Sequence, residues 1–136
     1  MILADTSAWV EYDRATGSAV DRRMTELIRA EGPLAVTEPV LMEVMAGARD
    51  AEREADLRQL LLGFDLLPFE AVADFEAAAR IYRRCRSVGV TPRGMVDCLI
   101  ASVARRHEAT ILAHDADLAR IAEVHGIALD GATTRV

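Results

Sequence analysis

Short apolar runs alternate along the chain with longer segments in which apolar residues recur at helical spacing. Four runs have the length and character of buried strands: residues 1–4, 34–36, 66–69 and 110–113. Within residues 20–30, Val20, Met24 and Leu27 are spaced as on one face of an amphipathic helix. Comparable patterns and flanking cap residues predict further helices over residues 8–12, 40–46 (with Thr37 as the cap), 52–62, 72–86, 91–107 and 115–124, and residues 127–129 are a candidate last strand.

Strands that alternate with helices are typical of a parallel sheet covered on both faces. We therefore predict an α/β fold, a three-layer α/β/α sandwich around a short, mainly parallel sheet. No linker, repeat or low-complexity stretch divides the 136 residues, so we expect a single domain over residues 1–136. Sheets of this kind bind ligands beyond the carboxyl ends of their strands, which makes residues that follow strands the first candidates for chemistry.

The composition is that of a soluble globular protein, with 51% hydrophobic and 28% charged residues. No apolar run approaches the roughly 20 residues of a membrane helix, and the N-terminus lacks the basic leader of a signal peptide. We therefore expect a cytoplasmic protein that does not associate with membranes. The two cysteines, Cys85 and Cys98, form no Cys-x-x-Cys pattern, so we expect small buried side chains rather than a zinc site or a disulfide.

The net charge of −6 argues against a protein that coats nucleic acid. It does not exclude an enzyme that acts on nucleic acid, because a carboxylate cluster that binds metal is itself a concentrated negative charge. All 16 basic residues are arginine and none is lysine. The absence of lysine bears on the alternatives considered below.

Two acidic residues interrupt apolar helices. Asp97 is the only charged residue between Arg93 and Arg105, and Glu43 stands within the apolar segment that starts at Val40. A buried carboxylate without a partner costs several kcal/mol, so it needs an arginine or a divalent cation beside it. From these helices alone, an ion pair and a metal site remain open for Asp97, and a solvent-exposed helix face remains open for Glu43.

Two more acidic residues follow strands at the edge where ligands bind. Asp5 and Asp115 each stand between a strand and a helix, where an aspartate is most often an N-cap, and Asp117 in the next helical turn suits the helix dipole. The joint pattern indicates more than capping if these segments meet with those of Asp97 and Glu43. Carboxylates held that close raise each other's pKa unless a cation neutralises them, and oxygen ligands favour magnesium or manganese over zinc.

Four motifs carry a resemblance to a known family. They are the opening Ile2-Leu3-Ala4-Asp5-Thr6-Ser7-Ala8-Trp9-Val10, the helix with Glu43 that ends at Gly47, the segment Val96-Asp97-Cys98-Leu99-Ile100-Ala101, and His114-Asp115-Ala116-Asp117-Leu118. In their order and spacing the chain resembles the PIN-domain ribonucleases and, among these, the VapC-like toxins of bacterial toxin–antitoxin pairs. The resemblance covers nearly the whole chain.

The resemblance implies a PIN-like fold and a magnesium-dependent endoribonuclease in which Mn²⁺ can substitute. It implies that Asp5, Glu43, Asp97 and Asp115 are catalytic and hold the metal, with Asp117 as a further ligand and Thr6 and Ser7 as supporting polar residues. It also implies a homodimer and inhibition by a VapB-like antitoxin that lies in a groove. The predicted helices over residues 52–62 and 72–82 are apolar enough to line that groove.

An RNA substrate must approach this negative site, and arginines are the candidates for phosphate contact. We single out Arg93, a turn before Asp97, and Arg83 and Arg86, for which a solvated helix face is the alternative. Aromatic residues make up 4% of the chain, too few for extensive base stacking. This favours a structured RNA such as tRNA or rRNA, recognised by shape.

Two other functions fit parts of the pattern. A phosphotransfer enzyme of the haloacid-dehalogenase or response-regulator type also places an aspartate after a strand, but it relies on a lysine, and the phosphatases among them need Asp-x-Asp where this chain has Asp5-Thr6-Ser7. A non-catalytic interaction module with the same fold is the second alternative. The presence of all four acidic residues argues against it.

Overall fold

A parallel sheet of four short strands lies at the centre of the computed structural model, which describes residues 1–136. The strands are β1 (Ile2–Ala4), β2 (Leu34–Val36), β3 (Asp65–Leu66) and β4 (Thr110–Leu112), in the order β3-β2-β1-β4. Leu3 lies opposite Ala35 on one side and Ile111 on the other. The first and last strands of the sequence are therefore neighbours, which brings the residues that follow them to the same sheet edge.

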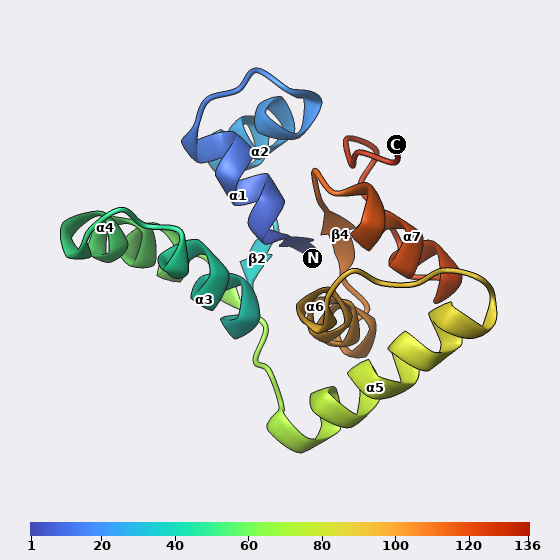
Figure 1. Ribbon diagram of the computed structural model, residues 1–136. Coiled ribbons are helices and arrows are strands. Elements are labelled where there is room, and N and C mark those ends of the chain that lie inside the picture. The colour runs from blue at the N-terminus through green and yellow to red at the C-terminus, as the bar shows by residue number, and fades with distance from the viewer.

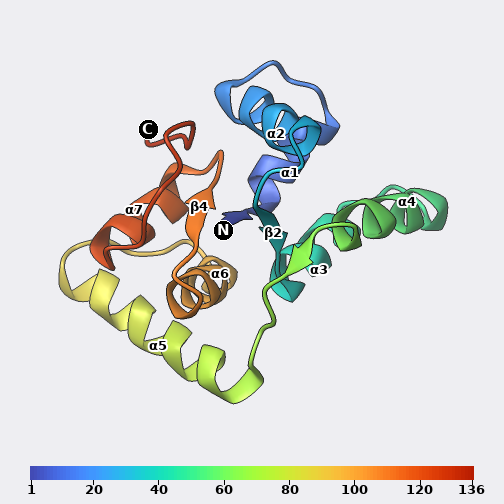
Figure 2. The same cartoon turned by 180° about the vertical axis from the view of Figure 1, so that it is seen from behind.

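Seven helices cover the two faces of this sheet (Figure 1), as the view from behind also shows (Figure 2). One face carries α1 (Thr6–Asp13), α2 (Ala19–Arg29), α3 (Glu38–Ala46) and α4 (Ala51–Leu62). The other carries α5 (Ala71–Ser87), α6 (Met95–Arg106) and α7 (Ala116–Val124). Right-handed crossovers explain the division, because the chain moves one way from β1 to β3 and returns the other way to β4. The predicted three-layer α/β/α sandwich is confirmed.

The core is one cluster of 31 buried residues from both helical layers and the sheet. All three residues of β2 are buried, and α6 is buried from Ile100 to Ala104. Both cysteines are free and buried, as predicted. None of the helices has the length and apolar character needed to cross a membrane.

Three local predictions were wrong in detail. Helix α6 begins at Met95 rather than Thr91. Thr91 stands before a proline, a position that disfavours helix, and the N–H of Arg93 bonds to the Asp117 carboxylate at 3.1 Å rather than within a helix. Strand β3 covers residues 65–66 rather than 66–69, since Pro68 cannot extend the ladder. In place of the candidate last strand there is a single bridge between Ile111 and Leu129.

Thr37 stands at the N-cap of α3 as predicted, but its hydroxyl makes no capping hydrogen bond. A capping side chain accepts from the second or third N–H of the helix. The second position here is Pro39, which has no N–H, so one of the two usual donors is missing.

Candidate functional site

Asp5 follows β1 and caps α1 with one of its two oxygens. Oδ2 accepts the Ser7 N–H at 3.1 Å and the Ser7 hydroxyl at 2.6 Å, which leaves Oδ1 without a partner. The residue is 3% exposed. The pKa of Asp5 is raised to about 6, chiefly by burial and also by the carboxylates of Glu43 and Asp115, while the hydrogen bonds from Ser7 act in the opposite direction. Asp5 is therefore a buried carboxyl group with other acids close by.

Two hydroxyls at the start of α1 connect the segments that carry the acids. The Thr6 hydroxyl donates to Glu43 Oε1 at 2.6 Å, which ties α1 to α3. The Ser7 hydroxyl, besides donating to Asp5, accepts the backbone N–H of His114 at 2.8 Å, which ties α1 to the turn after β4. The two residues that the sequence singled out as supporting groups thus each donate a hydrogen bond to an acidic side chain.

Asp97 lies in the first turn of α6, half-buried, with neither a hydrogen bond nor an ion pair on its carboxylate. Burial raises its pKa to about 7, and four carboxylates add to the effect: Asp5, Asp115, Asp117 and Glu43. The other four predicted acidic residues therefore lie close enough to Asp97 to act on it electrostatically. Segments far apart in the sequence meet here because β1 and β4 are adjacent and α6 packs beneath them.

Asp115 and Asp117 differ from the other acids because arginines pair with them. Asp115 caps α7, with Oδ1 accepting the Asp117 N–H at 2.9 Å. The guanidinium of Arg93 lies 3.6 Å from Asp115 Oδ1 and 4.0 Å from Asp117 Oδ1, and Arg120 lies 3.4 Å from Asp117. By contrast, Asp5, Glu43 and Asp97 take part in no ion pair of the structure.

The chemistry of the acidic side chains at this site suits a hard divalent cation. The ligands offered are carboxylate oxygens, and a cation would relieve the repulsion that raises the pKa of Asp5 and Asp97. The N-termini of α1, α6 and α7, where Asp5, Asp97 and Asp115 lie, also favour negative charge.

In the arrangement seen, however, no group of three or more acidic, histidine or cysteine side chains is placed so that it could hold a metal ion. Several of the carboxylates are turned toward other partners. Glu43 accepts from Thr6, and Asp115 accepts from the start of α7. Binding an ion would need the carboxylates to move closer together, with Glu43 Oε2 and Asp115 Oδ2 free of hydrogen bonds.

The predicted arginines fall in two places. Arg93 lies at the acids, whereas Arg83 and Arg86 are exposed on α5 and contact none of them, with Arg86 lying over the Tyr82 ring at 5.8 Å from its centre. Sequence reasoning missed Arg120. Its position three residues after Asp117 on a helix was the available signal, because such residues are neighbours on the helix surface.

The imidazole of His114, next to Asp115, makes two contacts that the sequence did not predict. Its Nδ1 lies 2.7 Å from the Thr134 hydroxyl and its Nε2 lies 3.5 Å from Glu11. These contacts come from the C-terminal tail and from α1. Their sequence separations of 20 and 103 residues leave no local pattern to detect.

The PIN domain family model matches residues 2–124 of the chain. The chain belongs to the PIN domain family. Its PIN domain is 46% identical over 125 residues to the VapC ribonuclease Mb1587 of Mycobacterium bovis, a match that covers 91% of this chain and 93% of that protein. The chain is thus a VapC-like member of the family, and the resemblance seen in its motifs is confirmed.

Solved structures share the fold of this PIN domain. VapBC2 from Rickettsia felis, crystallised with a DNA fragment from its promoter, superposes with a TM-score of 0.73 at 18% identity, covering 96% of this chain and 98% of the other. A toxin–antitoxin complex from Klebsiella pneumoniae gives a TM-score of 0.63 at 20% identity, covering 85% and 87% of the two chains. At these identities the likeness establishes the PIN-like fold.

Proposed function

We propose that this PIN domain is a magnesium-dependent endoribonuclease, the toxin of a VapC-like toxin–antitoxin pair, which hydrolyses phosphodiester bonds of structured cellular RNA. The observation that carries the proposal is the meeting of Asp5, Glu43 and Asp97, three acids with no cation of their own, beside Asp115 and Asp117. The relative from Mycobacterium bovis, named a ribonuclease, supports the activity at 46% identity.

In this proposal Asp5 and Asp97 hold Mg²⁺, or Mn²⁺ in its place, with Glu43 and Asp115 as further catalytic ligands and Asp117 at the margin. When bound, the ion lowers the pKa of an attacking water and stabilises negative charge at the phosphate. Thr6 and Ser7 orient Glu43 and Asp5 through their hydroxyls. The Cys98 thiol is not available as a nucleophile here, because burial raises its pKa to about 12.

The proposed substrate is a folded RNA such as tRNA or rRNA. Arg93 is an exposed cation 3.6 Å from Asp115 and is well placed to meet a phosphate, while Arg83 and Arg86 are exposed on α5 for contacts further away. Aromatic residues are scarce, and Trp9 is buried against Phe64 with their ring centres 5.3 Å apart, so it is not free to stack on bases.

A VapB-like antitoxin is the proposed inhibitor. A pocket of about 110 Å³ lies between α1, α3 and α4, and Glu43 is one of its lining residues together with Trp9, Val44 and Leu57. A segment of antitoxin lying there could bring a basic side chain to the acids. Of the two helices that the sequence suggested for a groove, α4 lines this pocket and α5 does not.

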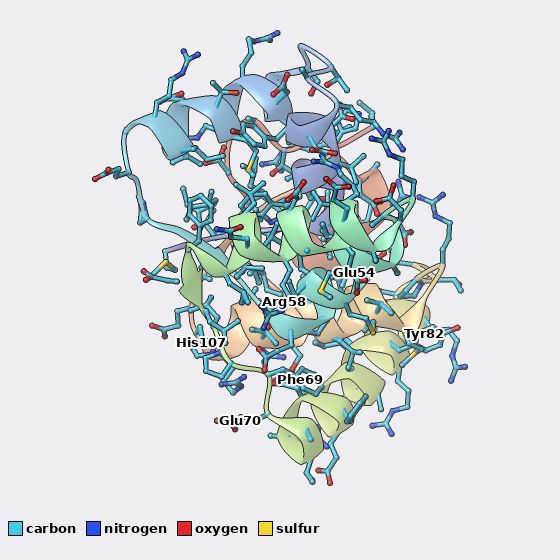
Figure 3. All side chains as sticks on the ribbon, turned by 90° about the vertical axis from the view of Figure 1, so that its left-hand side faces the viewer. Glu54, Arg58, Phe69, Glu70, Tyr82 and His107 are labelled. Atoms are coloured by element: carbon cyan, nitrogen blue, oxygen red, sulfur yellow. The ribbon has the colours of Figure 1, made fainter.

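We also propose that the toxin is a homodimer. Figure 3 views the side on which Glu54 and Arg58 stand on α4, while Phe69 and Glu70 lie just before α5. Phe75 on α5 is 58% exposed, with its ring centre 5.1 Å from that of Phe69. Exposed apolar side chains of this kind support an interface at the start of α5.

RNA cleavage with and without divalent cations tests the enzymatic proposal. We expect the wild-type protein to cut RNA in Mg²⁺ or Mn²⁺ and to lose this activity in EDTA. Asp97→Asn should abolish cleavage while the protein stays folded and still binds its antitoxin. Asp56→Asn on the exposed face of α4 is the matched control and should leave cleavage unchanged.

Three outcomes would count against the proposal. Cleavage that persists in EDTA would defeat the metal mechanism. Failure to cut any RNA with either cation would favour the non-catalytic interaction module. Loss of both cleavage and antitoxin binding in Asp97→Asn would assign Asp97 a structural role instead.

A further inference from the structure

Arg93 occupies a loop position from which its side chain reaches the acidic site. Residues 91–94 lie between α5 and α6, and the Arg93 backbone N–H is fixed by a 3.1 Å hydrogen bond to Asp117 Oδ2. The Arg93 guanidinium lies 3.6 Å from Asp115 and 4.0 Å from Asp117, and Asp117 also pairs with Arg120. The backbone of Arg93 is therefore anchored to the site independently of its side chain.

The ion pairs that the side chain makes are weak by geometry and by exposure. Both distances, 3.6 Å and 4.0 Å, are longer than a hydrogen-bonded ion pair, and the Arg93 side chain is 76% exposed. Exposed pairs of this kind contribute little and exchange readily with solvent. Asp115, by contrast, is 26% exposed and has Oδ2 free of hydrogen bonds.

We infer that Arg93 is a built-in competitor of the divalent ion: its guanidinium partly neutralises Asp115 and Asp117 in the metal-free protein and its positive charge opposes binding of the ion. The inference rests on the proposed function, because it takes the acids to be a metal site. A positive side chain beside the ligands lowers their affinity for a cation in two ways: it partly neutralises the Asp115 carboxylate, and it repels the cation directly. Arg93 thus raises the concentration of divalent ion at which the enzyme becomes active.

Calorimetric titration of the full chain with Mn²⁺ tests this competition. We expect Arg93→Gln to bind Mn²⁺ about two- to five-fold more tightly than the wild type, the range that loss of exposed ion pairs implies. Arg93→Lys keeps the charge and should stay close to the wild-type affinity. Arg29→Gln is the matched control, because Arg29 is exposed at the end of α2 and makes no ion pair. It lies just before the start of β2, whereas Asp5 and Asp115 follow the ends of β1 and β4.

Thermal unfolding separates competition from a structural role. Loss of a counter-ion should lower the Tm of Arg93→Gln only without metal, because the ion restores the balance of charge. The increase in Tm on adding Mn²⁺ should therefore be larger in Arg93→Gln than in the wild type. A residue that only stabilises the fold would lower Tm equally in both conditions, and that result would overturn the inference.

The outcomes distinguish this inference from the proposed function. If the wild type binds Mn²⁺ and Arg93→Gln binds it with the same affinity, or no more tightly than Arg29→Gln does, Arg93 is not a competitor although the metal site stands. If neither the wild type nor Arg93→Gln binds Mn²⁺, the metal site itself is refuted and the inference falls with it.

Discussion

At the scale of single residues, Asp5 and Asp115 each cap a helix and keep one carboxylate oxygen free. Each caps a helix through one oxygen, Oδ2 of Asp5 and Oδ1 of Asp115, and the other oxygen accepts no hydrogen bond. A cap fixes the side chain at the sheet edge, and the second oxygen remains available to a ligand. The capping interpretation drawn from the sequence is therefore confirmed for both residues, and it is compatible with the proposed role as metal ligands.

Asp97 should make the stability of the metal-free protein depend on pH. Its pKa is about 7 in the folded chain and that of Asp5 is about 6, against an ordinary value of 3.8. Between about pH 4 and 7 the folded state binds more protons than the unfolded state, so the free energy of unfolding falls as pH rises, by about 1.4 kcal/mol for each unit of pKa shift.

The expected result is a Tm in EDTA that decreases from about pH 4.5 to about pH 7.5, with a smaller decrease in Asp97→Asn. The variant should also be the more stable protein at the upper end of this range. A parallel decrease in both proteins would show that Asp97 does not carry the effect.

Thr6 should be a positioning residue that acts through Glu43. Thr6→Val removes the 2.6 Å hydrogen bond to Glu43 Oε1 and keeps the shape of the side chain. Loss of a group that orients a metal ligand typically lowers metal affinity or activity about 10- to 100-fold. The affinity for Mn²⁺ measures the effect, with Thr16→Val as the control, since the Thr16 hydroxyl bonds to Glu11 at an exposed position. Equal affinities for Mn²⁺ in Thr6→Val and Thr16→Val would show that Thr6 does not position a metal ligand.

At the scale of elements, the sequence predicted most helices and strands but not the loop before α6. The apolar spacing in residues 20–30 and the cap at Asp115 each gave an element within a residue or two of its observed bounds. The start of α6 was misplaced because Thr91 stands before a proline, which disfavours helix, and because the Arg93 N–H bonds to Asp117, a contact across 24 residues. Periodicity reports which face of an element is buried, whereas a long-range hydrogen bond leaves no such pattern.

A buried ion pair joins α5 to α6 away from the acidic site. Asp74 is 1% exposed and accepts from Arg106 at 2.7 Å and 3.2 Å and from Ser102 at 2.6 Å. Burial opposes its ionisation, but these hydrogen bonds and that from the Glu70 N–H outweigh it and lower the pKa of Asp74. The pair therefore holds α5 against α6, the helix that carries Asp97.

Asp74→Asn should lower the free energy of unfolding by about 2 to 3 kcal/mol, at the low end for a broken buried pair because the Arg106 side chain is 27% exposed. Denaturant unfolding measures the loss, with Glu76→Gln on the exposed face of α5 as the control. A change no greater than that of the control would mean that the pair contributes nothing net.

At the scale of the whole molecule, the strand order β3-β2-β1-β4 makes the site. It sets β1 beside β4, and so brings together acids that lie more than 100 residues apart in the sequence. The order of the motifs was enough to predict the fold and this meeting of acids. It could not predict that Arg93 pairs with Asp115 and Asp117, because Arg93 reaches them from a loop whose placement only the folded chain defines.

The proposed ribonuclease activity depends on the acids forming a cation site. A crystal of the protein soaked in Mn²⁺ and measured at a wavelength where manganese scatters anomalously tests this most directly. We predict an anomalous peak within bonding distance of carboxylate oxygens of both Asp5 and Asp97. A map with no peak at these residues in the presence of saturating Mn²⁺, or with a peak only elsewhere on the surface, would contradict the account.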